Sequence, residues 1–208
     1  MLITPVPPVA CVAAFSAQLP TFLSGASGIS NQNYLGTPPA IPSAAQLGPG
    51  VPLAQQVFLL TLNAAASNPG VINPPADGWR FLAGHASAPV LARVAQLAPS
   101  QNWKLTGVFF GARVSDAILA TQQLHNLPDV AKNDYELRVL VVPGLNLEAF
   151  WLVAQTAGSF DLIVPFPAGA EQPIAALRTH NPYKMVTFLA LLRPLIAGAR
   201  TMPAGYGA

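Results

Sequence analysis

The chain has 208 residues, of which 52% are hydrophobic and only 9% are Asp, Glu, Lys or Arg. Soluble proteins carry about 25% charged residues on average, and this composition excludes a charged disordered tail and a coiled coil. The single cysteine excludes a disulfide scaffold. The 10 basic residues are scattered singly, which argues against the clustered basic surface that nucleic-acid binding requires.

Charge is distributed unevenly along the chain. All charged residues lie at or after Asp77, whereas residues 1–76 hold 12 of the 22 prolines. Runs such as 37–42 and 48–52 cannot be continuous helix or central strand, because proline lacks the backbone donor and fixes φ. Residues 1–76 are therefore predicted to form an uncharged Pro-, Ala- and Gly-rich arm. Its aliphatic residues favour packing on this chain or on a neighbouring subunit over a solvated linker.

One regular element is expected inside this arm, a helix near residues 52–66 with Pro52 in its first turn. No apolar stretch reaches the about 20 residues that a membrane-spanning helix needs. A signal peptide is disfavoured because no basic residue precedes the apolar run at 9–15. We therefore expect no transmembrane segment and take a cytoplasmic location as the default.

Residues 77–200 are predicted to form the folded domain. Strands are expected at 79–83 and 103–114, where alternating, β-branched and aromatic residues occur. Helices are expected at 88–97, whose apolar residues have helical spacing, and at 115–124.

Three closely spaced strands should follow, at 135–142, 145–154 and 160–165. Their short connections favour an antiparallel meander. A last helix is expected at 183–192, preceded by Asn181 as its cap, with residues 201–208 as an irregular tail. Together these elements predict an α+β fold, a mainly antiparallel sheet with helices on one face.

The search for chemistry yields no catalytic, cofactor-binding or metal-ligating motif, so we predict no cofactor. His85 follows a predicted strand and precedes a predicted helix, a position where ligand contacts gather. It could form a site with Asp161 or Asp116, or be an ordinary loop histidine. Glu148 is separated by one residue from two aromatic residues and is a weak functional candidate, although it could instead be a surface partner of Arg138.

Aromatic residues supply the candidate interface positions. Neighbouring aromatic residues in one strand point to opposite faces, so pairs such as Phe109–Phe110 and Phe150–Trp151 require two covered faces or a partner surface. The residues that we consider as interface anchors are Phe15, Phe22, Tyr34, Phe109, Phe150, Trp151 and Phe188.

These observations favour a non-enzymatic structural or interaction subunit of a larger assembly, in which the arm packs on neighbouring protein subunits and the chain is an oligomer. One alternative is a self-contained ligand- or protein-binding accessory domain whose arm folds onto its own sheet. A small hydrolase that uses His85 is a less favoured alternative.

Overall fold

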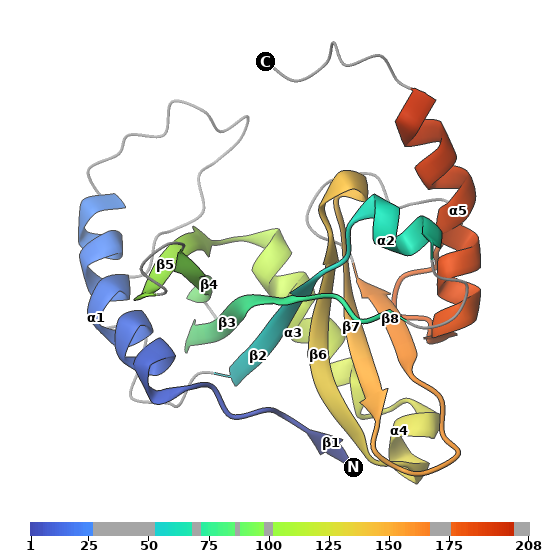
Figure 1. Ribbon diagram of the computed structural model, residues 1–208. Helices are drawn as coiled ribbons and strands as arrows, with labels where there is room; N and C mark the ends of the chain where they lie inside the picture. Colours follow the sequence, from blue (N-terminus) through green and yellow to red (C-terminus); the bar gives the residue numbers. More distant parts are fainter. Residues whose placement is uncertain (27–52, 68–71, 86–87, 98–101, 167–175, 202–208) are drawn as a thin grey trace.

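The computed structural model describes residues 1–26, 53–67, 72–85, 88–97, 102–166 and 176–201. Within these residues a nine-stranded sheet has the order β5-β4-β3-β2-β6-β7-β8-β9, and β1 pairs with β6 at its first residues (Figure 1). The strands are β1 (Leu2–Ile3), β2 (Leu53–Leu59), β3 (Ala76–His85), β4 (Ala88–Leu97), β5 (Asn102–Phe109), β6 (Tyr135–Val142), β7 (Leu147–Ala154), β8 (Leu162–Phe166) and β9 (Tyr183–Lys184).

The sheet consists of two antiparallel halves that meet along one parallel seam. Strands β2 to β5 form one half and β6 to β9 the other, and β2 runs parallel to β6 where they meet. The short β1 is also parallel to β6. The predicted α+β class with a mainly antiparallel sheet is therefore confirmed.

Helices cover both faces of this sheet rather than the one face that we expected. Helix α1 (Val9–Ala26) packs over β3–β5, and α2 (Leu62–Ser67) and α5 (Met185–Thr201) pack over β6–β8. These three lie on the same face, since Ala54 and Phe58 of β2 both point toward it. Helices α3 (Ala112–Leu124) and α4 (Pro128–Lys132) cover the opposite face.

The meander of β6, β7 and β8 and the strand β3 are confirmed close to their predicted bounds. Both faces of β7 are buried, because Phe150 packs under α3 while Trp151 belongs to the core beneath α5. The pair Phe150–Trp151 is therefore explained by two sheet faces that are both covered by this chain, and it requires no partner surface.

One predicted helix is a strand, and another is a strand over its first half. Residues 88–97 form β4, and the region 52–66 divides into β2 and the short α2. Val90, Leu91 and Ala92 are all buried because helices cover both faces of β4. A strand buried on both faces loses the alternation that would identify it.

The last helix begins later and ends later than predicted. Tyr183 and Lys184 form β9, and α5 then continues through Pro194 to Thr201. Residues 202–208, part of the expected tail, lie outside the described residues.

The residues that we assigned to an arm contribute to the sheet. Residues 1–26 supply β1 and α1, and β2 takes a central place between β3 and β6. The proline-rich runs at 37–42 and 48–52 lie outside the described residues, as does Tyr34.

Candidate functional site

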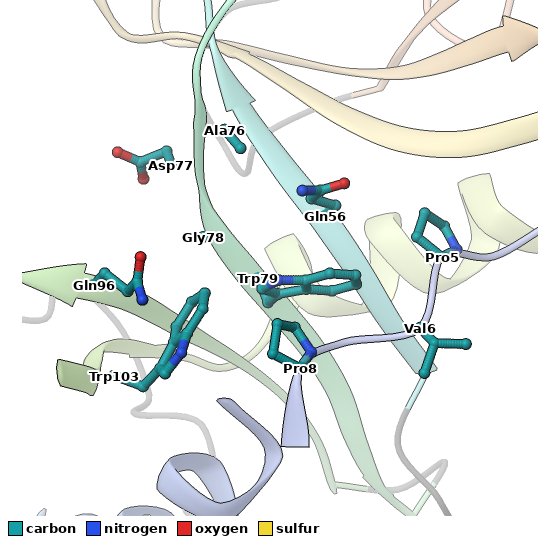
Figure 2. Close-up of a pocket in the computed structure, with 10 residues that line it drawn as sticks. All are labelled: Pro5, Val6, Pro8, Gln56, Ala76, Asp77, Gly78, Trp79, Gln96 and Trp103. Atoms are coloured by element: carbon teal, nitrogen blue, oxygen red, sulfur yellow. The ribbon is translucent and has the colours of Figure 1, made fainter. Parts of the chain in front are cut away.

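A pocket of about 700 Å³ lies beside the beginning of α1 (Figure 2). Residues 4–8 connect β1, at the edge of β6, to α1 over β4 and β5, and this crossing segment supplies Pro5, Val6 and Pro8 to one side of the pocket. The sheet supplies the rest from β2 to β5. The pocket is thus built from residues that are distant in the sequence.

Two tryptophan–glutamine pairs form the sheet side of this pocket. Trp79 of β3 lies opposite Gln56 of β2, and Trp103 of β5 lies opposite Gln96 of β4. Neither glutamine carboxamide makes a hydrogen bond to a residue that the structure describes. The pocket therefore combines aromatic surface with amide groups that are available to a ligand.

The beginning of β3 shapes the pocket through a β-bulge at Asp77 and Gly78. The register between β2 and β3 shifts here, and Gly78 has φ +148°. A Cβ atom on Gly78 would lie 2.3 Å from the carbonyl oxygen of Val94, so only glycine fits this approach. Asp77, the one charged residue among the described residues of the lining, forms an ion pair with Arg93.

Helix α1 is fixed on the sheet beside this pocket. Its inner face includes Phe15, whose ring stacks on Phe81 with centroids 4.5 Å apart. Gln18 accepts a hydrogen bond from the N–H of Leu105 at 2.9 Å and donates one to the carbonyl of Trp103 at 3.5 Å. Because β5 is an edge strand, these bonds occupy backbone groups that would otherwise be open to another strand.

The outer face of α1, which we call the α1 outer face, carries no charged side chain. Val9 is 86% exposed, Val12 37% and Phe22 42%. Exposed apolar side chains gathered on one helix face are typical of an interaction surface. The exposed residues of α1 are Val9, Ala10, Val12, Ala13, Ser16, Ala17, Pro20, Thr21 and Phe22.

A buried polar cluster lies on the opposite face of the sheet, beneath α3. Arg80 donates from Nε to Oε1 of Gln55 at 2.6 Å and from Nη1 to Oε2 of Glu148 at 3.1 Å. Its guanidinium also lies over the rings of Phe150 and Phe166, at 5.5 and 5.1 Å from their centroids. Burial and mutual pairing give this cluster the character of a structural clamp.

Glu148 therefore pairs with Arg80 and not with Arg138, the partner that we considered from the sequence. Arg138 instead donates from Nε to Glu136 at 2.6 Å. It lies on the face of α1 and α5, with its guanidinium over Phe58 and Trp151.

The candidate interface anchors have different positions in the structure. Phe15, Phe150, Trp151 and Phe188 are buried in the core of this chain. Their rings are not available to a partner of the folded chain. Phe109 is partly buried against the core beneath α3, and Phe22 lies exposed on the α1 outer face.

His85 and Asp161 are not brought together. His85 ends β3 at the hairpin to β4, whereas Asp161 precedes β8, with β2, β6 and β7 between the two strands. Asp161 accepts hydrogen bonds from Trp151 Nε1 at 2.9 Å and from the N–H of Ala154 at 3.0 Å. Its carboxylate thereby fastens the β7–β8 connection.

Cys11 lies on the inner face of α1 and is fully buried. Burial raises the pKa of its thiol to about 11. Cys11 therefore packs as a small hydrophobic residue.

Within the part of the chain that the structure describes, no group of three or more His, Cys, Asp and Glu side chains could hold a metal ion. None of the described helices combines the length and the apolar character that a membrane crossing requires. Comparison with protein-family models, curated proteins and solved structures found no match to this chain.

Sequence reasoning missed the pocket because it assigned Gln56 and Gln96 to helices. Both glutamines lie in strands whose neighbours are buried on both faces. The pairing of each glutamine with a tryptophan could have indicated the pocket. This pairing depends on the register between neighbouring strands, which the sequence alone does not give.

Proposed function

We propose that this chain is a non-enzymatic interaction subunit that assembles with copies of itself through the α1 outer face. The observation that carries the proposal is the exposure of Val9 and Val12 on a helix of 18 residues without a charged side chain. Solvent-facing helix surfaces are ordinarily charged or polar. Burial of this face against a second copy would remove its apolar surface from water.

The protected sheet edge supports the choice of α1 as the contact element. Gln18 already occupies the N–H of Leu105 on the edge strand β5, and the other edge strand, β9, has only two residues. Assembly by strand addition is therefore disfavoured at both edges, whereas the α1 outer face stays open.

The test is the absolute mass of the full-length chain in solution, measured by light scattering after size exclusion. Wild type should give a multiple of 21.7 kDa. The double variant Val9→Glu/Ala13→Lys should give the single-chain mass, because both positions are exposed and the new charges oppose apolar contact. A Glu four residues before a Lys supports the helix itself.

The matched control is Val186→Glu/Ala190→Lys on α5, where both residues are also exposed and have the same spacing. This control should retain the wild-type mass. A monomeric wild type, or equal dissociation of both double variants, would overturn assembly through α1.

The second candidate function is a self-contained binding domain, and the pocket beside α1 is the observation that favours it. Its volume of about 700 Å³ lies within the range of about 300–1,000 Å³ that small-ligand sites occupy. A monomeric wild type that retains the folded α1 would favour this candidate over assembly, whereas ligand binding at the pocket tests it directly.

A further inference from the structure

We propose that the pocket between residues 5–8 and the rings of Trp79 and Trp103 binds an uncharged, proline-rich extended segment of a partner protein. This inference deepens the second candidate function and does not depend on assembly through α1. The two proposals are tested by different quantities, peptide binding and particle mass.

The hydrogen-bonding groups of the pocket match the needs of such a segment. A polyproline II segment has no internal hydrogen bonds, and its prolines present carbonyl oxygens without N–H donors. A binding surface must therefore supply donors and apolar rings. The carboxamides of Gln56 and Gln96 and the indole N–H group of Trp103 are three such donors, while the buried Trp79 contributes apolar ring surface to the wall.

None of these three donors bonds to a residue that the structure describes. The one carboxylate in the lining, Asp77, would repel a carbonyl-rich segment if it were free, but Arg93 already pairs with it. The donor groups are thus available, whereas the acid is engaged elsewhere.

The chain's own prolines show that this pocket accommodates proline beside indole rings. Pro5 and Pro8 line the same pocket as Trp79 and Trp103 (Figure 2). They are three residues apart, which is the period of a polyproline II helix and brings both to one side. Val6, 88% exposed, offers a further apolar contact at the rim.

The electrostatics of the lining specify an uncharged segment. Apart from the paired Asp77, none of the lining residues that the structure describes carries a charge. A charged peptide would lose hydration on entering the pocket without gaining an ion pair. An acidic or basic segment is therefore disfavoured.

The test titrates the full chain with a capped ten-residue peptide that repeats Ala-Pro-Pro, using calorimetry and tryptophan fluorescence. A control peptide replaces every proline by serine. The proline peptide should bind with a Kd below about 1 mM, the weak end of specific affinity. The serine peptide should bind at least about tenfold more weakly, because it is flexible and loses conformational entropy on binding. The proline peptide is already restricted to the extended conformation before it binds.

The variant Gln96→Ala should weaken the proline peptide by about fivefold to tenfold, the loss of one hydrogen bond. Gln96 is exposed, so the fold should survive, and circular dichroism verifies this. Gln122→Ala on α3, also exposed and on the opposite face, is the matched control and should bind as wild type does.

Three results would overturn the inference: absence of binding at about 1 mM peptide, equal affinity for both peptides, or equal weakening by Gln96→Ala and Gln122→Ala. Binding of a neutral oligosaccharide in place of the peptide would likewise reject a protein segment as the occupant. A failure here with an oligomeric wild type would leave assembly through α1 intact.

Discussion

Arg80 on β3 and Glu148 on β7 form an ion pair that crosses two intervening strands, β2 and β6. Their side chains are 3% and 11% exposed. Strands β2 and β6 form the parallel seam between the two antiparallel halves of the sheet. The pair therefore ties the two halves together beneath α3, independently of the backbone hydrogen bonds.

We expect Arg80→Met to lower the free energy of unfolding by about 3–5 kcal/mol, because it removes the buried guanidinium that bonds both Gln55 and the Glu148 carboxylate. Urea denaturation measures the loss. The matched control is Glu136→Gln, which breaks the more exposed pair with Arg138 and should cost about 1 kcal/mol or less. Equal losses in the two variants would contradict the clamp.

Gly78→Ala should destabilise the fold by at least about 2 kcal/mol, since it combines a strained φ with overpacking. The new methyl group would meet the carbonyl of Val94 at 2.3 Å. Gly198→Ala on α5 is the control, where a Cβ meets nothing within 4 Å and alanine should stabilise the helix by up to about 1 kcal/mol. Thermal melts of both variants would reveal the opposite signs, and a neutral Gly78→Ala would disprove the close approach.

Two phenylalanines on α1 should behave differently. Phe15→Ala removes the ring that stacks on Phe81 and should cost about 3–5 kcal/mol. Phe22→Ala removes an exposed ring and should change the free energy of unfolding by about 0.5 kcal/mol or less. Denaturation at low protein concentration, where assembly does not contribute, provides the comparison. Similar costs would show that α1 is not anchored through Phe15.

Cys11 should resist alkylation by iodoacetamide at pH 8 in the folded chain and react readily after denaturation. The thiol has a pKa of about 11 in the folded chain, whereas the pKa of an unfolded cysteine is about 8.5. The folded state therefore holds this proton more tightly, and its contribution to stability is complete below the unfolded pKa.

That contribution should decline as the pH rises from about 8.5 toward about 11. Melting temperatures of wild type and Cys11→Ala over this interval test the sign, because the variant should decline less steeply. Tyr135, whose pKa burial also raises, is present in both proteins and cancels in the comparison. Parallel curves, or rapid alkylation of the folded chain, would refute the burial of the thiol.

A strand could be predicted from the sequence where one of its faces is more exposed than the other. Glu136 and Arg138 alternate with the buried Leu137 and Val139 along β6, so its period was visible in the sequence. In β4 and the central β2 both faces are covered, so their apolar residues do not alternate with polar ones, and periodicity alone cannot distinguish these strands from buried helices.

The site was less predictable than the fold. Helix α1 contains Pro20 and no charged residue, so neither its amphipathic pattern nor its boundaries stood out. The pocket depends on the pairing of Trp79 with Gln56 and on the path of residues 4–8, which are tertiary relationships. Aromatic residues such as Phe150 and Phe188 marked the core, since composition does not distinguish a core ring from an interface ring.

The pairing of Gln56 with Arg138 joins two strands that are synthesised at different times, which affects how the chain folds on the ribosome. Strand β2 is synthesised long before β6, its permanent neighbour. Translation adds about 5–20 residues per second, so one edge of β2 lacks its partner strand for several seconds while the residues up to β6 are synthesised. During that interval the nascent chain presents an open, uncharged strand edge, and its yield in cells should depend on chaperones that shield such edges.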